Sequence, residues 1–392
     1  SFTIFPGFAD SIPLTGTGSP NRDVPQQMFD FIEASTALTA QPRGLVLIDP
    51  NYKQPSEWKF AIGGTWDMEW LGGMTLDFDY LHTRGDNPAH YRDVSQTIVG
   101  ETLAGSPIYD YYTFDTFGVE ARDNLMLTNS SANPTSDMLS FVLSKYWDNG
   151  LSARLGYAYI DGEDVASMIA ATANSNFTGE AVTDINVPGA STSNWVVPQR
   201  VTLSLFYENE IFGNARTRFS LQGFWNEGQA QSYVMDSSQL EGDGFNGRHL
   251  LYVPDGPNDP NVVYDWDDPA MMQEFFDFIE RENLKPGFSR RNAHHTGWSN
   301  VWHLTIRQEV PLGETLWGNV YFKVKNLGNL LNDDWGKVTD AQFFPPEVLR
   351  DVNLTPTGQF EYEEFDDQSL QRTYVNPSLW EIRFGIDIRF GT

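Results

Sequence analysis

The sequence predicts an all-β fold, a transmembrane antiparallel β-barrel with long loops at one end. Apolar residues alternate with polar ones in nine segments, short turns join these segments into hairpins, and very long connections separate the hairpins. Successive side chains of a strand point to opposite faces, so this alternation gives each strand one apolar and one polar face. A membrane-spanning strand needs only about 9–11 residues. A mean hydropathy of −0.40 is therefore compatible with crossing lipid.

The first hairpin shows the alternation most clearly, with a turn at residues 71–73. Lys59, Asp67 and Asp77 lie between its apolar residues. The apolar residues of its two predicted strands are Trp58, Phe60, Ile62, Trp66, Met68, Trp70, Met74, Leu76, Phe78 and Tyr80.

Three further hairpins and a last strand follow the same pattern. Their turns lie at residues 148–150, where Asp-Asn-Gly is a strong turn signal, at 213–214, and at 311–313. The predicted strands cover residues 139–147, 151–159, 201–207, 219–225, 302–310, 316–324 and 380–390. Together with the first hairpin these make nine strands.

Long connections separate the hairpins, and their lengths orient the chain. They cover residues 83–137, 161–198, 227–300 and 326–378. Structureless loops of this length are uncommon in compact soluble domains. Outer-membrane barrels have short periplasmic turns and long extracellular loops. We therefore expect extracellular loops and a periplasmic C-terminus. Residues 28–33 and 268–280 follow helix-start signals, and we expect two short helices packed within loops.

Composition argues against several classes of function. No apolar run reaches the roughly 18 residues of a spanning helix, and there is no cysteine for disulfides or thiolate chemistry. A net charge of −28 argues against nucleic-acid binding, which needs basic surface. The histidines and paired carboxylates form no recognisable catalytic arrangement, so we expect no enzyme.

The aspartates of residues 252–268 suggest a cofactor site. Carboxylate oxygens are the ligands that calcium prefers, although the spacing does not match an EF-hand loop. A solvated acidic loop is the simpler alternative, so no cofactor is firmly expected. The candidate calcium ligands are Asp255, Asp259, Asp265, Asp267 and Asp268.

Charged residues of both signs alternate with the apolar ones, which places them on the face toward the barrel lumen. Such a wall suits contact with an internal plug or with a hydrated channel. These residues are Arg154, Arg200, Arg218, Arg307, Arg383, Arg389, Asp67, Asp77, Glu208, Glu309, Glu381 and Asp387.

The last strand resembles the outer-membrane β-signal that the barrel-assembly machinery reads. In this motif a polar residue is followed two positions later by glycine and then by two alternating apolar residues. The positions that carry the resemblance are Arg383, Gly385, Ile388 and Phe390.

More of the chain resembles TonB-dependent outer-membrane receptors, particularly the Oar-like branch. The similarity lies in the order and placement of six short stretches. They are residues 54–60 (QPSEWKF), 127–130 (LTNS), 191–195 (STSNW), 247–254 (GRHLLYVP), 259–264 (DPNVVY) and 324–332 (VKNLGNLLN).

This resemblance implies a 22-stranded barrel, an N-terminal plug, and energy delivered by the TonB complex. No plug or TonB box is recognisable, and only nine strands are. We therefore expect residues 1–392 to be the C-terminal part of a single barrel domain, with TonB contacted through a missing N-terminal part. Residues 1–10 lack signal-peptide features, so we expect a removed signal peptide or a start within a longer protein.

The implied function is solute capture by extracellular loops and import into the periplasm. The implied partners are the assembly machinery, lipopolysaccharide, outer-membrane lipid and a small solute. No residue pattern selects among siderophores, glycans, peptides and cobalamin. Loop residues considered for solute binding are Arg248, His249, Tyr252, Trp266 and Trp298.

Two alternatives remain open: a passive porin-like channel, and a secreted all-β carbohydrate-binding or hydrolytic protein. Aromatic residues near predicted strand ends favour a membrane barrel over the secreted protein, because such barrels carry aromatic girdles. These residues are Trp58, Trp70, Trp147, Tyr159, Trp225, Trp302 and Trp380.

Overall fold

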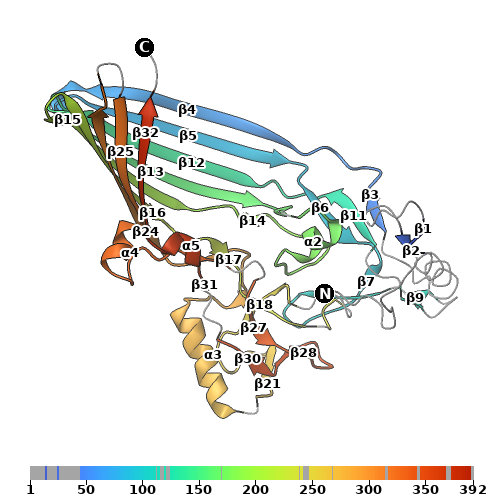
Figure 1. The fold of residues 1–392 in the computed structure, drawn as a ribbon. Coiled ribbons are helices and arrows are strands. Elements are labelled where there is room, and N and C mark those ends of the chain that lie inside the picture. The colour runs from blue at the N-terminus through green and yellow to red at the C-terminus, as the bar shows by residue number, and fades with distance from the viewer. Residues whose placement is uncertain are drawn as a thin grey trace.

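The computed structural model describes residues 45–111, 124–168, 170–237, 239–241, 247–266, 268–313, 317–341, 345–367 and 372–389, with four two-residue strands elsewhere. Those four are β1 (Leu14–Thr15), β2 (Val24–Pro25), β9 (Thr113–Phe114) and β10 (Val119–Glu120). The described chain is mainly β-strand, which confirms the all-β class (Figure 1). The predicted helix at residues 28–33 lies outside the described residues. No described helix has the length and apolar character needed to cross a membrane.

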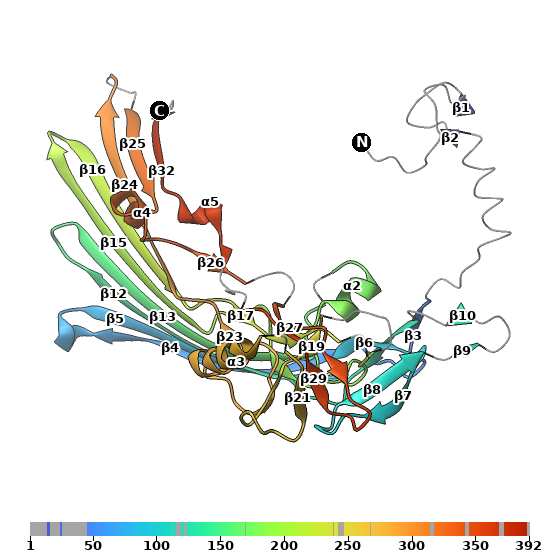
Figure 2. The ribbon, with the colours of Figure 1, turned by 90° about the horizontal axis from the view of Figure 1, so that it is seen from below.

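One large antiparallel sheet contains the nine strands predicted from the sequence. Its strand order is β32-β25-β24-β16-β15-β13-β12-β5-β4, and the two-residue strand β14 (Ser191–Thr192) adds to β13. Figure 2 shows that the sheet is strongly curved, with β4 and β32 at its two edges. The described strands therefore form an open sheet and not a closed barrel. Its strands are β4 (Ser56–Met68), β5 (Met74–Asp86), β12 (Thr135–Tyr146), β13 (Leu151–Asp164), β15 (Gln199–Phe212), β16 (Ala215–Asn226), β24 (Ser299–Pro311), β25 (Trp317–Lys325) and β32 (Glu381–Arg389).

Short turns join these strands in pairs at one end of the sheet (Figure 1). The first hairpin closes through the 3-10 helix η1 (Glu69–Leu71) and a left-handed Gly72. At the second, Gly150 has φ +83°, and a Cβ there would lie 2.0 Å from the Glu208 carbonyl oxygen. Only glycine satisfies both constraints, because it lacks a Cβ and tolerates positive φ.

Register separates the two faces of the sheet. One row of register partners across the sheet is apolar throughout: Trp66, Leu76, Leu143, Leu155, Leu203, Gly223 and Trp302. The adjacent row, one residue along each strand, is polar throughout: Asp67, Thr75, Ser144, Arg154, Ser204, Gln222 and His303. A one-residue shift changes face in a pleated sheet, so the two rows point in opposite directions. We call the first face the apolar face and the second the polar face.

The long connections at the other end are folded, and they contain small sheets as well as the helix expected at residues 268–280. Segments 227–298 and 326–380 share small sheets: β18 (Val234–Met235) pairs in parallel with β27 (Glu347–Arg350), and β21 (Val262–Tyr264) with β29 (Phe360–Tyr362). The two strands of each pair come from different connections, so the two connections fold together. We call this unit the loop module. Its other elements are β17 (Ala230–Gln231), β19 (His249–Leu250), β20 (Tyr252–Val253), α3 (Pro269–Arg281), β22 (Gly287–Phe288), β23 (His294–His295), α4 (Leu327–Leu331), β26 (Thr339–Asp340), β28 (Asn353–Leu354), β30 (Glu364–Phe365), β31 (Arg372–Thr373) and α5 (Val375–Ser378).

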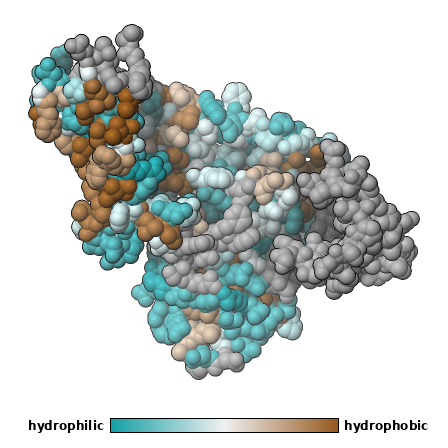
Figure 3. All heavy atoms as spheres, in the orientation of Figure 1, coloured by the Kyte–Doolittle hydropathy of each residue, from teal (hydrophilic) through white to brown (hydrophobic). Residues whose placement is uncertain are grey.

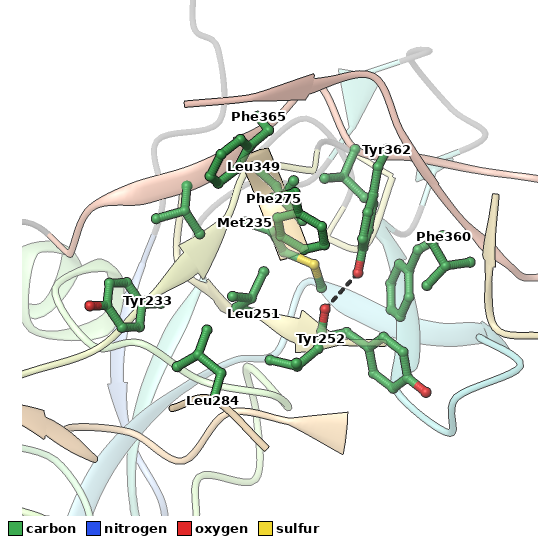
Figure 4. Packing of buried hydrophobic residues seen from close by; sticks show 14 of the residues in the cluster. Tyr233, Met235, Leu251, Tyr252, Phe275, Leu284, Leu349, Phe360, Tyr362 and Phe365 are labelled. Atoms are coloured by element: carbon green, nitrogen blue, oxygen red, sulfur yellow. Dashed lines mark hydrogen bonds between the residues drawn. The ribbon is translucent and has the colours of Figure 1, made fainter. Parts of the chain in front are cut away.

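An aromatic-rich core holds the loop module together (Figure 4). Tyr362 is fully buried, and its hydroxyl donates to the Tyr252 carbonyl oxygen at 2.6 Å. Phe275 packs edge-on against Tyr362 and Phe365. Burying a large apolar side chain is worth roughly 1.5–3 kcal/mol. The module therefore has its own source of stability, beyond its connection to the sheet.

Helix α3 confirms the predicted helix and its packing role. Asp268 caps its N-terminus by accepting a hydrogen bond from the Ala270 amide at 2.9 Å, and Pro269 occupies the first turn. Phe275 and Phe278 are completely buried in the module core. The apolar side of α3 thus covers the core of the loop module.

The remaining connections form a second small unit beside the sheet. Here β11 (Leu125–Asn129) pairs with β3 (Val46–Ile48) and β6 (Ala89–Asp93), and β7 (Gln96–Glu101) pairs with β8 (Pro107–Tyr111). Helix α2 (Ala173–Thr178) buries Phe177 against Tyr109 and Leu125.

Candidate functional site

The apolar face of the sheet is exposed over most of its strands. Figure 3 shows hydrophobic residues gathered over β25 and β32. On β32 the side chain of Phe384 is 69% exposed, and on β4 that of Trp58 is 75% exposed. Soluble monomers rarely expose contiguous apolar patches above a few hundred Å². Exposed apolar faces of this kind mark interaction sites in folded proteins.

Polar residues border this face at both ends of β12. Leu139, Phe141 and Leu143 lie on it between Asp137 near the loops and Lys145 near the turns. The hydroxyl of Tyr80 donates to Asp137 at 2.6 Å, which fixes the border on the loop side. Eight residues at about 3.3 Å each place these charges roughly 26 Å apart along the strand. The apolar face is therefore a band of limited height.

The opposite face carries the charges predicted for the lumen, and several of them pair within the sheet. Arg218 binds Glu208 and lies 3.5 Å from Glu309. Arg307 lies 3.9 Å from Asp387 on β32. Register also places the other predicted charges of β4, β5, β13 and β15, together with Glu381 and Arg383, on this face, as expected. The side chain of Arg389 lies outside the described residues. These charges therefore do not need an internal plug as their partner.

Three of the predicted solute-binding residues are buried in the loops. Arg248 and His249 are 2% and 3% exposed, and Tyr252 belongs to the module core. The guanidinium of Arg248 stacks on the Phe177 ring, 4.3 Å from its centroid, and donates to the Phe177 carbonyl oxygen. These side chains join loop segments and do not reach the surface in this structure.

Burial decides the protonation state of His249, which lies beside Arg248 and Glu241. Loss of solvent, reinforced by the adjacent Arg248 cation, lowers the pKa of His249 to about 3. Its Nε2 atom lies 3.4 Å from a Glu241 carboxylate oxygen. This distance would suit an ion pair, but we assign a neutral imidazole because Arg248 already faces the same carboxylate at 3.5 Å.

The other two predicted binding residues are more accessible. Trp298 is 53% exposed just before β24, and it remains a contact candidate. Trp266 is half-buried and packs edge-on against Phe275, 5.6 Å between ring centroids. The structure therefore separates these five residues and does not bring them into one site.

The candidate calcium ligands are also separate. Asp259 accepts hydrogen bonds from the Asp255 amide, the Asn261 amide and the Tyr252 hydroxyl. Burial opposes ionisation of Asp259, but these bonds outweigh it and lower its pKa. Asp268 caps α3, Asp265 is exposed, and Asp267 lies outside the described residues. In the described parts of the chain, no three acidic or histidine side chains are placed to hold a metal ion.

The assembly-signal residues lie on the edge strand β32. Arg383 binds Glu381 on the polar face, and Ile388 is exposed. Gly385 lies opposite Tyr321 on β25, and a Cβ there would lie 2.4 Å from that ring. Glycine is therefore required at position 385, because the Tyr321 ring covers it and leaves no room for a Cβ. Phe390 lies outside the described residues.

A pocket of about 300 Å³ lies between the loops, and no sequence pattern predicted it. Its walls come from Val165, from residues 181–184 and 187–191, from Leu250 and from residues 288–291. These segments are separated by tens of residues, and no local pattern marks them as neighbours.

Comparisons with protein-family models, with curated proteins and with solved structures give no match for this chain. Function is therefore inferred from geometry and chemistry.

Proposed function

We propose that this chain forms wall strands and extracellular loops of a TonB-dependent receptor in the outer membrane of a Gram-negative bacterium. In this proposal the apolar face contacts lipid, the polar face lines the lumen, and the folded loops capture a solute outside. The solute then enters the periplasm with energy supplied through TonB. The barrel-assembly machinery recognises β32, and lipopolysaccharide surrounds the border on the loop side.

The exposed apolar face carries this proposal. Water-soluble sandwiches bury the apolar face of a sheet against a second layer. Here side chains such as Phe60, Phe141 and Phe384 are exposed. If the strands tilt by about 35–45°, as barrel strands do, the roughly 26 Å band on β12 rises about 20 Å. That is close to the roughly 25 Å apolar band of outer-membrane barrels.

The asymmetry of the connections supports the orientation. All short turns lie at one end and the folded loops at the other, as in outer-membrane barrels. In hydrocarbon, unpaired backbone groups cost several kcal/mol each. The proposal therefore requires that the outer edges of β4 and β32, unpaired among the described strands, be paired in the assembled protein.

Energy coupling distinguishes this receptor from a porin. The resemblance of residues 324–332 and the other short stretches to TonB-dependent receptors favours the receptor. The experiment measures surface binding and intracellular accumulation of radiolabelled solutes from a panel, in cells with and without TonB. We expect binding in both strains and accumulation only with TonB. Equal accumulation without TonB would favour the porin and contradict the proposal.

A further inference from the structure

The pocket between the loops has apolar walls and a defined size. Its apolar lining includes Val165, Val182, Val187, Pro188, Leu250 and Phe288. Val187 at its edge is 67% exposed. A volume of about 300 Å³ corresponds to on the order of ten water molecules at about 30 Å³ each. The pocket therefore suits a ligand of dipeptide size, at the small end of ligand sites.

Hydrogen bonds hold the pocket walls in place. Val182 and Leu250 lie on neighbouring loop segments. The Val182 amide donates to the Arg248 carbonyl oxygen and the Leu250 amide donates to the Val182 carbonyl oxygen, each at 2.9 Å. Phe288 packs on Tyr252 in the module core, 5.2 Å between ring centroids. A site that is already ordered loses little entropy when a ligand binds.

A buried ion-pair network fixes the base of the same pocket. Arg291, only 5% exposed, donates to Glu180 at 2.6 Å and to Asp164 at 2.5 Å. The Ser191 hydroxyl donates back to the Arg291 carbonyl oxygen at 2.8 Å. The charge of Arg291 is therefore neutralised, and this residue acts as a clamp between two pocket walls.

Two other charged side chains line the pocket and remain available to a ligand. Arg290 is exposed and, within the described residues, has no carboxylate in ion-pair range. On Asp184, one carboxylate oxygen accepts bonds from the Tyr109 hydroxyl and the Asn186 and Val187 amides. Its second oxygen has no bonded partner among the described residues. The pocket thus presents one cation and one anion beside apolar walls.

The charge of the surrounding loops decides between ligand classes. Residues 236–285 and 332–371 together contain 22 acidic and five basic side chains. Their field repels a purely anionic ligand. A purely cationic ligand would leave Arg290 unpaired. A ligand with both charges and no net charge satisfies Arg290 and Asp184 together.

We propose that this pocket binds a short apolar peptide with free termini, its carboxylate on Arg290 and its ammonium on Asp184. The apolar side chains of the peptide contact Val182, Leu250 and Phe288. This inference deepens the proposed function by naming the class of solute that the loops capture. It rests on that function only for the peptide's later transport.

Calorimetry on the detergent-solubilised protein tests the proposal with the dipeptide leucyl-leucine. We expect saturable binding, weakened at least about tenfold when its amino group is acetylated or its carboxylate is amidated, because each change removes a charge-assisted bond. Leucyl-leucine should bind the Arg290→Gln variant about as weakly as the amidated peptide binds the unaltered protein. For this variant, amidation of the peptide should cause little further loss of affinity. Asp184→Asn should show the same pattern with the acetylated peptide.

Arg281→Gln is the matched control, since Arg281 lies outside the pocket and pairs with Glu282 and Asp367. Its affinity for leucyl-leucine should be unchanged. No binding of leucyl-leucine at millimolar concentration, or equal affinity for the capped and free peptides, would overturn the proposal. Because binding is measured without transport, bound peptide together with TonB-independent uptake would contradict the proposed function and leave this site standing.

Discussion

Single buried charges determine how the loops hold together. Arg291 joins Asp164 at the end of β13 to Glu180 beyond α2, and it lies more than 100 residues after both in the chain. Removing one partner of a buried pair costs about 3–5 kcal/mol because the other charge is left uncompensated. The network therefore specifies which loop conformation is allowed, in addition to any net stability that it contributes.

His249 gives the loops a defined response to acid. Its pKa of about 3 in the folded protein lies below the ordinary value of 6.5. Below pH 6.5 the unfolded chain takes up a proton that the folded chain does not. The contribution of His249 to the free energy of unfolding is therefore fully present above pH 6.5. It is lost as the pH falls toward 3, by at most about 1.4 kcal/mol per pH unit.

We predict that His249→Gln weakens this response to acid. Glutamine does not titrate, so the variant should lose less stability than the unaltered protein between pH 6.5 and 4. Thermal unfolding followed by near-ultraviolet circular dichroism at several pH values measures the stability of both proteins. The difference between them cancels the contribution of the carboxylates, which the two proteins share. Parallel pH dependences for the two proteins would show that His249 is not held neutral.

The sequence drew attention to Arg248 and His249 but predicted a different role for them. Their residue types suit ligand contact as well as buried pairing. The choice depends on Glu241 and on Phe177, which is 71 residues from Arg248 in another loop segment. Trp298 stays exposed because nothing in the described loops covers it. Side-chain exposure in loops is set by these distant contacts, so residue type alone could not predict it.

At the level of elements, the strands were predictable because their signal is local. Alternation along residues 139–147 depends on neighbouring positions, and the structure confirms β12 there. Helix α3 was predictable for the same reason, from Asp268, Pro269 and the apolar spacing that follows. The parallel pair of β18 with β27 joins residues more than 100 positions apart, and strands of two and four residues leave no periodic signal.

Substitutions on β12 should show two different environments. Leu143 lies on the apolar face, while Ser140, on the polar face, has Asp79 as its register neighbour. Leu143→Arg should destabilise the protein by about 2–4 kcal/mol in lipid, whereas Ser140→Arg should cost much less. Denaturant-induced unfolding in lipid vesicles measures both. Similar losses at the two positions would mean that the faces are wrongly assigned.

For the whole molecule, the turn and loop ends should lie on opposite sides of the membrane. The chain has no cysteine, so a single introduced thiol gives an unambiguous label. Asn149 in a short turn and Asp255 in the loop module are both exposed. In intact cells an impermeant maleimide should label Asp255→Cys and spare Asn149→Cys, which becomes labelled after the outer membrane is permeabilised. The reverse pattern would invert the proposed orientation.

The pocket is a property of the whole molecule, and the sequence predicts such properties least well. Its charged residues, Asp184 and Arg290, are more than 100 positions apart, and only the fold of the loops brings them to one cavity. Barrel closure is likewise a property of the whole assembly. The nine strands follow from their own sequence, but the pairing of the outer edges of β4 and β32 does not.

The central claim is that the apolar face of the sheet contacts lipid. Nitroxide labels on single cysteines at positions 139–144 of β12, in protein reconstituted into bilayers, test it most directly. Oxygen concentrates in lipid, whereas a nickel chelate stays in water. Labels at 139, 141 and 143 should be accessible to oxygen and protected from nickel, and those at 140, 142 and 144 should show the opposite preference. Uniform accessibility along the strand, or nickel access at the odd positions, would contradict the claim.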